Sequence, residues 1–113
     1  LGVYLATGQD AANIVEGSQG ITHVEAQETG VYFSVTLPNI IVGTVGAGKK
    51  LAFVKENLAL LGCSDESDGA QNAKRLALIV AGTVFCGELS VLAAQTNRGE
   101  LMRCHRAMER EKK

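Results

Sequence analysis

The chain of 113 residues lacks tryptophan, contains one proline and three cysteines, and has only 4% aromatic residues. It also lacks an excess of charge, because 11 Lys and Arg residues are balanced by 12 Asp and Glu residues, which gives a formal net charge of −1. A general nucleic-acid-binding domain carries a large basic excess, so this class is excluded. Hydrophobic residues make up 46% of the chain, so disorder of the whole chain is excluded and one globular domain is expected.

The cysteines are too widely spaced for a structural metal site or a disulfide framework. Cys63, Cys86 and Cys104 form no CxxC pair, and His23 and His105 are the only histidines. A zinc site needs a cluster of such ligands, so we expect no metal. Thiols without disulfide partners are typical of a reducing compartment, and we therefore expect a cytoplasmic location.

Long hydrophobic runs are also lacking. The longest apolar run, Leu76 to Phe85, is about half the length of a membrane span and contains Gly82. We therefore expect no membrane-spanning segment in this chain. No signal peptide is recognisable, because the residue at position 1 is leucine and the first apolar stretch leads directly into polar residues 7–10. The sequence begins within an apolar pattern, so we expect it to be a piece of a longer protein.

The pattern of apolar residues predicts a helix-rich α+β unit with one small antiparallel sheet. Alternating residues 21–26 and 31–37 predict a hairpin, and residues 40–42 are expected to resume its second strand. Helices are expected over residues 1–15, 50–61, 70–95 and 100–113. The helix over 70–95 is apolar on nearly all sides, so we expect it to be buried. Asp68, followed by Gln71, predicts its N-cap.

A glycine-rich loop, GTVGAGKK, covers residues 43–50 and nearly matches the P-loop pattern GxxxxGK[ST]. Lys50 stands where a hydroxyl would hold magnesium, and the loop follows a hairpin, whereas P-loop sheets are parallel. Two other interpretations remain open: a turn that needs glycine dihedrals, and a backbone that must approach a cofactor or a second chain. We expect at least one positive φ within residues 46–48.

Five motifs occur in an order that covers almost the whole chain: ATGQDAA at 6–12, VYFSVTLP at 31–38, GTVG at 43–46, GELS at 87–90 and LMRCH at 101–105. Together they resemble the C-terminal part of the catalytic domain of hydroxymethylglutaryl-coenzyme A (HMG-CoA) reductases. The usual loop of that family is GTVGGGT, so Ala47 and Lys49 depart from it. Arg106 also departs from the family, which usually has Met or Leu there.

This resemblance implies that residues 1–113 are part of the substrate-binding domain, with the small cofactor domain lying upstream. The family reduces the HMG-CoA thioester to mevalonate with two NADPH molecules and releases coenzyme A, a step of isoprenoid biosynthesis. Its active site lies between two subunits, so a homodimer or a larger homo-oligomer is implied. The family uses a Glu, a Lys, an Asp and a His. Only Asp10 and His105 correspond to them here, so the chain alone is expected to be inactive.

The residues alone leave the roles of Asp10 and His105 open. Asp10 follows a mostly apolar segment, where a carboxylate either caps local N–H groups or pairs with a distant cation. The resemblance implies the second, with Asp10 holding the family's lysine close to the carbonyl that gains negative charge. His105 taken alone is typical of a surface histidine. The resemblance implies that it protonates the departing coenzyme A thiolate.

The resemblance also implies positions that bind ligands. NADPH would contact Gly46, Ala47, Gly48 and Arg110, and the substrate would contact Ser90 and Ala94. Arg103, Arg106 and Arg110 share a helix face that suits phosphates, although a solvated helix of mixed charge explains them as well. Core hydrogen bonding likewise explains Ser90. Two alternative functions remain: a P-loop-like nucleotide-binding domain, and a non-catalytic interaction module that docks through helix 70–95.

Overall fold

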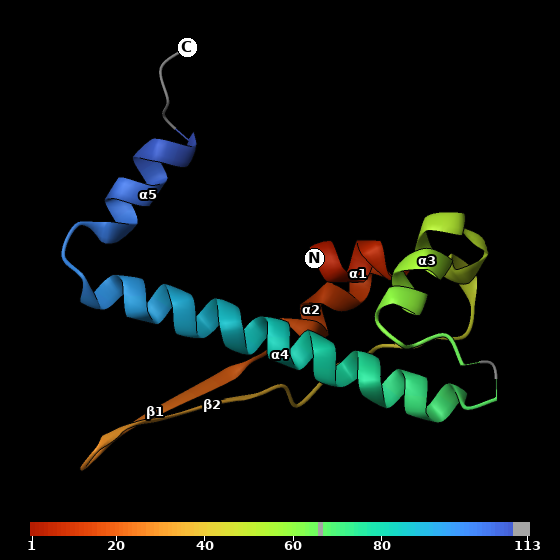
Figure 1. Ribbon diagram of the computed structural model, residues 1–113, viewed down its shortest axis with the longest axis horizontal. Coiled ribbons are helices and arrows are strands. Elements are labelled where there is room, and N and C mark those ends of the chain that lie inside the picture. The colour runs from red at the N-terminus through yellow and green to blue at the C-terminus, as the bar shows by residue number, and fades with distance from the viewer. Residues whose placement is uncertain (66, 110–113) are drawn as a thin grey trace.

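The computed structural model describes residues 1–65 and 67–109 and confirms the α+β arrangement (Figure 1). The helices are α1 (Gly2–Ala6), α2 (Ile14–Gly17), α3 (Ala52–Leu60), α4 (Gly69–Thr96) and α5 (Glu100–Glu109). Two short 3-10 helices are η1 (Ala11–Asn13) and η2 (Ala47–Lys50). The strands β1 (Ile21–Gln27) and β2 (Gly30–Thr36) complete the elements.

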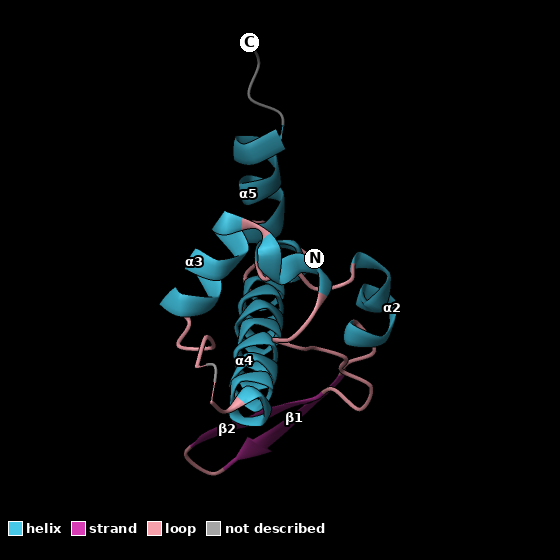
Figure 2. Ribbon diagram, turned by 90° about the vertical axis from the view of Figure 1, so that its right-hand side faces the viewer, coloured by secondary structure: helices cyan, strands magenta, loops and turns pink. Residues whose placement is uncertain are grey.

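The predicted hairpin is confirmed. Strands β1 and β2 pair antiparallel, from Ile21 opposite Thr36 to Gln27 opposite Gly30. The rings of Phe33 and Phe85 meet edge to face with centroids 5.1 Å apart, so the hairpin is attached to α4 through an aromatic contact. The two ribbon views place α1 and α3 on one side of α4 and the hairpin on the other (Figures 1 and 2).

Residues 40–42 do not resume the strand, so this prediction was wrong. The segment has no partner strand in the described part of the chain, and it packs instead against the core. Ile40 and Val42 contact the core cluster, and the Ile41 carbonyl accepts a hydrogen bond from the Tyr4 hydroxyl at 3.0 Å. An alternating pattern needs a neighbouring strand before it can form a ladder, and here Ile40 and Val42 contact the core instead.

The predicted helix over residues 1–15 is interrupted. Helix α1 ends at Ala6, and Gly8 adopts φ +66, a conformation that glycine reaches without steric cost. The chain turns at this glycine and restarts in η1 and α2. Asp10 therefore lies in a short connection between two helical pieces.

The core lies where α1, α3 and α4 meet. Its buried apolar residues are Tyr4, Val54, Leu58, Cys63, Leu76 and Val80. Burial raises the pKa of the Cys63 thiol above its ordinary value, which keeps this cysteine in the unreactive thiol form. Cys86, in contrast, is exposed on α4. The core is small because only one end of α4 takes part in it.

Helix α4 begins as predicted, since Asp68 Oδ1 accepts a hydrogen bond from the Gln71 backbone N–H at 3.0 Å. The prediction that this helix is buried was wrong. Only Asn72, Leu76 and Val80 are buried along its 28 residues. The sequence showed that α4 is apolar on nearly all sides, but the other described elements cover only the side that carries these three residues.

Helix α4 also bears on the expectation that no segment spans a membrane. In the part of the chain that the structure describes, it is the one helix long and apolar enough to cross a bilayer, judged by length and composition alone. Only 11% of its most apolar stretch is buried within this chain. Core helices of soluble proteins satisfy the same criteria, so this observation assigns no membrane location.

We expect the isolated chain to self-associate, because large apolar side chains remain exposed. Leu60 is 86% exposed, Val45 81% and Leu78 73%. Exposed apolar side chains of this size favour association. Light scattering of the purified chain at micromolar concentration is expected to show dimers or larger species. A monodisperse monomer would contradict this prediction.

Candidate functional site

Of the two arrangements that the sequence left open for Asp10, the structure shows the capping of local N–H groups. Its Oδ1 accepts a hydrogen bond from the Ala12 backbone N–H at 2.9 Å and caps η1. The residue is exposed, so its charge stays solvated and needs no buried counter-ion. Among residues 1–65 and 67–109, no ion pair to Asp10 is found. A cation from outside the described residues is therefore able to approach this carboxylate from solvent.

Gln9, directly before Asp10, ties this segment to the glycine loop. Its Nε2 donates to the Gly43 carbonyl at 2.9 Å and to the Thr7 carbonyl at 2.8 Å. Its Oε1 accepts from the Gly43 N–H at 2.8 Å. One amide side chain thus pairs with both backbone groups of Gly43. Sequence reasoning missed this contact, because no periodic pattern relates residues 34 positions apart.

A second contact joins the same two segments. A Cβ placed on Gly48 would lie 2.5 Å from the Gly8 carbonyl oxygen and 2.6 Å from the Gly8 Cα. No real Cβ tolerates such distances, so the two backbones touch only because both residues are glycine. The glycine loop is thereby held against Gly8 and Gln9, the two residues that precede Asp10. These two contacts define what we call the Gln9 junction: Gly8 and Gln9 against Gly43 and Gly48.

The glycine loop itself is confirmed as a turn with a positive φ. Gly46 has φ +117, and a Cβ there would meet nothing within 4 Å. Ala47 and Gly48 continue into η2, which ends with Lys49 and Lys50. An open glycine turn followed by two ammonium groups is a combination that suits phosphate groups in general.

The P-loop alternative finds no support in this geometry. In a P-loop, a strand of a parallel sheet leads through the loop into the N-terminus of a helix. Here the sheet of the described residues is an antiparallel hairpin, and η2 follows the loop. Leu51 then adopts an extended conformation before α3 begins, so the helix N-terminus does not follow the loop directly.

His105 lies on α5, where its Nδ1 is 2.9 Å from Glu109 Oε2, one helical turn away. The side chain is 39% exposed. A carboxylate at Nδ1 fixes the orientation of the ring and directs Nε2 away from the pair. Glu109 thus contacts Nδ1 of this ring and not Nε2.

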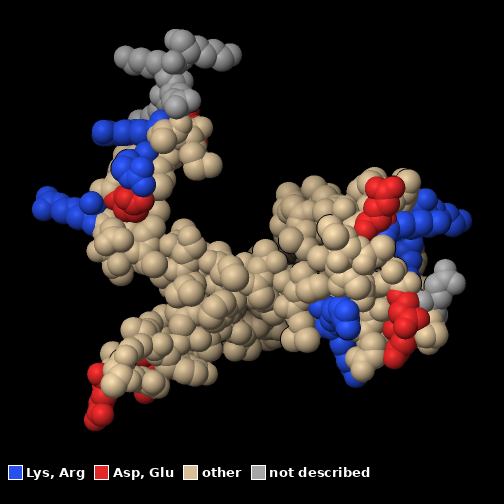
Figure 3. All heavy atoms as spheres, viewed as in Figure 1, with Lys and Arg blue, Asp and Glu red and all other residues tan. Residues whose placement is uncertain are grey.

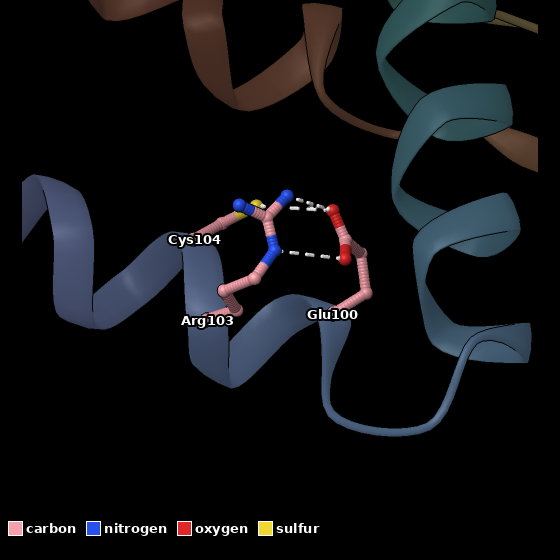
Figure 4. Close-up of polar contacts among 3 residues, drawn as sticks. All are labelled: Glu100, Arg103 and Cys104. Atoms are coloured by element: carbon pink, nitrogen blue, oxygen red, sulfur yellow. Dashed lines mark hydrogen bonds and ion pairs between the residues drawn. The ribbon is translucent and has the colours of Figure 1, made fainter.

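Arg103 is engaged on the same helix (Figure 4). Its guanidinium makes two hydrogen bonds to Glu100, at 3.1 and 2.5 Å, and Cys104 Sγ also approaches this carboxylate at 3.6 Å. The Arg103 hydrogen bonds hold the pKa of Glu100 below its ordinary value and raise the pKa of Arg103. The solvated mixed-charge interpretation therefore describes Arg103. Arg110 lies outside the described residues.

The predicted substrate residues lie on the second half of α4. Ser90 is exposed, and Ala94 is half-buried where it lines a small cavity of about 160 Å³ at the corner between α4 and α5. Glu88, two residues before Ser90, accepts a hydrogen bond from the Thr22 hydroxyl at 3.4 Å. Glu88 therefore serves the contact between helix and hairpin.

The chain brings some of the predicted residues together and keeps others apart. Asp10 and the glycine loop meet through the Gln9 junction, whereas α5 leaves the far end of α4, away from α1 and α3 (Figure 1). Lys and Arg side chains gather on α5 and at the opposite end of the molecule, and the middle is uncharged on the face shown (Figure 3). Asp10 and His105 therefore do not share one site within a single chain.

Comparison with known proteins agrees with the motifs. The profile described as hydroxymethylglutaryl-coenzyme A reductase matches residues 1–110. The 3-hydroxy-3-methylglutaryl-coenzyme A reductase of Methanocaldococcus jannaschii is 47% identical over 108 residues, which cover 96% of this chain and 25% of that protein. The corresponding reductase of Aeropyrum pernix is 45% identical over 109 residues, covering 96% of this chain and 26% of that protein.

A plant relative is equally similar. The 3-hydroxy-3-methylglutaryl-coenzyme A reductase 1 of Arabidopsis thaliana is 52% identical over 108 residues, which cover 91% of this chain and 18% of that protein. The chain thus spans about a quarter or less of the length of these relatives. Because the profile covers nearly every residue and the identities approach one half, the chain belongs to the hydroxymethylglutaryl-coenzyme A reductase family.

Proposed function

We propose that this chain is the C-terminal part of the catalytic domain of a reductase that converts HMG-CoA to mevalonate with two NADPH molecules and releases coenzyme A. The family is one of oxidoreductases that use a nicotinamide cofactor and HMG-CoA. The observation that carries the proposal is the Gln9 junction, which holds Asp10 beside an open glycine turn. The remaining catalytic groups and the small cofactor domain would lie in the rest of the protein.

The cofactor would lie against Gly46, Ala47 and Gly48, with Arg110 as a further contact, and it supplies hydride when bound. Asp10 is exposed and, among the described residues, its carboxylate accepts one hydrogen bond, so it is able to hold an ammonium group against the reacting carbonyl. That pairing stabilises the negative charge that the carbonyl oxygen gains. Asp10 would have this function in both reductions, that of the thioester and that of the aldehyde formed from it.

His105 would act on the coenzyme A thiolate that leaves the substrate. Reduction of the thioester expels coenzyme A as a thiolate, and Nε2 of His105 would give it a proton, because Nδ1 is held by Glu109 at 2.9 Å. Protonation prevents the thiolate from adding back to the aldehyde. Ser90 and Ala94, on the α4 surface that leads toward α5, would contact the coenzyme A side of the substrate.

A second copy of the chain would complete the site. Asp10 lies between α1 and η1, over the middle of α4, whereas His105 lies on α5 beyond one end of α4, so two subunits would each contribute one of them to a shared active site. A homodimer or larger homo-oligomer would also cover the exposed side chains of α4. The reductase would act in the cytoplasm, whether or not the whole protein carries a membrane anchor.

The test uses the full-length protein that contains this chain. HMG-CoA is expected to start oxidation of NADPH, with two NADPH consumed for each mevalonate formed. NADH in place of NADPH measures the preference for the 2′-phosphate. ATP with magnesium is the matched control for the P-loop alternative, and no hydrolysis is expected. Oxidation of NADPH that does not depend on HMG-CoA would contradict the proposal.

A further inference from the structure

Gln9 is the side chain with the most connections around Asp10. Its backbone N–H donates to the Tyr4 carbonyl at 2.8 Å, so the residue is fixed to the end of α1. Its side-chain amide makes three further hydrogen bonds, two of them to Gly43 across the junction. An amide uses both a donor and an acceptor here, which neither a carboxylate nor a hydrocarbon side chain can reproduce.

The junction is tightened from both sides. The Tyr4 hydroxyl donates to the Ile41 carbonyl at 3.0 Å, two residues before Gly43. On the other side of Gly8, Val54 of α3 lies so close that a Cβ on Gly8 would be 2.9 Å from its Cγ1. The backbone before Asp10 is therefore held by α1, α3 and the glycine loop together. After Asp10, the capping hydrogen bond to Ala12 holds the other end.

We infer that Gln9 is a positioning residue, which fixes the Asp10 carboxylate relative to the glycine loop through its paired hydrogen bonds to Gly43. Gln9 has no reacting atom to contact, because its amide is already engaged with backbone groups. The inference rests on the proposed function, since it assigns Gln9 a role in placing a carboxylate that acts on the carbonyl. A shift of the loop would therefore reach Asp10 through the Gln9 side chain as well as through the Gly8–Gly48 contact, without any change in the chemistry of Asp10 itself.

Loss of the Gln9 hydrogen bonds to Gly43 should lower kcat and leave KM for HMG-CoA nearly unchanged. Misplacing a reacting group by about 1 Å costs on the order of 100-fold in rate. Substrate contacts on α4 lie outside the junction and stay intact when Gln9 changes. We therefore expect kcat to fall about 10- to 100-fold in a variant without the Gly43 hydrogen bonds, while KM for HMG-CoA changes less than about threefold.

The experiment compares three variants of the full-length protein. Gln9→Met keeps the length of the side chain and removes its hydrogen bonds. Gln9→Asn keeps the amide but is one methylene too short to reach both groups of Gly43. Gln19→Met is the matched control, because Gln19 also links two segments through a hydrogen bond, to Asn39 at 2.5 Å, but does not touch the glycine loop. Each variant is assayed for kcat, for KM and for its thermal unfolding midpoint.

Amide hydrogen exchange supplies a measurement that does not depend on activity. Both Gln9 variants are expected to speed exchange in peptides covering residues 43–50, with no change in peptides covering 76–96, and Gln19→Met should match the wild type in both. Wild-type kcat in the two Gln9 variants would overturn the inference. A fall in kcat together with a rise in KM and a lower thermal unfolding midpoint would also overturn it. So would the loss of soluble protein in both variants, because these outcomes assign Gln9 a structural role alone.

The failure of the proposed function would look different. In that case the wild-type protein itself shows no HMG-CoA-dependent oxidation of NADPH, whatever residue occupies position 9. Faster exchange in residues 43–50 would then still report a junction, but the catalytic assignment of Gln9 would be overturned together with that of Asp10. An active wild type with unaffected Gln9 variants would overturn only the positioning role.

Discussion

Asp10→Ala is expected to abolish reduction of both HMG-CoA and free mevaldehyde in the full-length protein. In the proposed mechanism, Asp10 stabilises charge at the carbonyl in both reductions, so neither substrate escapes the loss. Removal of one group that stabilises an oxyanion typically costs about 100- to 1,000-fold in kcat, and removal of the carboxylate that holds the ammonium should cost at least as much. Oxidation of NADPH with each substrate measures both effects.

The control for this variant is Asp68→Ala. Asp68 is also an exposed aspartate that caps a helix, with Oδ1 accepting from the Gln71 N–H at 3.0 Å. Its replacement removes a cap, at a cost of about 0.5–2 kcal/mol in stability, but leaves the proposed site intact. If Asp68→Ala and Asp10→Ala lose activity equally, the effect of Asp10 is one of capping, and its catalytic role is wrong.

His105→Gln is expected to separate the two substrates. Glutamine keeps much of the volume of histidine but cannot become a cation, so it cannot protonate the coenzyme A thiolate. Reduction of HMG-CoA should fall about 10²- to 10⁴-fold, the usual contribution of a positioned acid. Reduction of mevaldehyde, which releases no thiolate, should keep most of its rate.

The partner of His105 offers the control. Glu109→Gln leaves the imidazole in place and weakens only the contact that orients Nδ1, which measures 2.9 Å. We expect a smaller loss on HMG-CoA than in His105→Gln and no loss on mevaldehyde. Equal losses of His105→Gln on both substrates would show that this histidine is structural or acts on the carbonyl.

Local chemistry made several features predictable from the sequence. Alternation of apolar residues was sufficient to predict the hairpin, although no residue of either strand is fully buried in this chain. Asp68 and Gln71 specify the start of α4 because the cap is formed within one helical turn. Gly46 is the residue in its turn that reaches a positive φ, as the glycines of the loop indicated.

Features that depend on distant partners could not be predicted in this way. The apolar surface of α4 indicated burial, but periodicity does not reveal whether neighbouring elements are present to cover it. Residues 40–42 carried a strand pattern without a strand to pair with. The Gln9 junction was invisible for the same reason, because a glutamine and a glycine far apart in the chain have no pattern in common. Motif resemblance identified Asp10 but not the residue that holds it.

The position of the hairpin within the chain has a consequence for assembly. Gln9 and Gly43 are 34 residues apart, and the whole β1–β2 ribbon lies between them. Once Ile21 and Thr36 are paired, the flexible chain that separates Gln9 from Gly43 shortens to roughly 20 residues, which lowers the entropic cost of closure by about 0.5 kcal/mol. The ribbon, which supplies none of the proposed catalytic side chains, therefore favours an order of folding in which it forms first and Gln9 pairs with Gly43 afterwards.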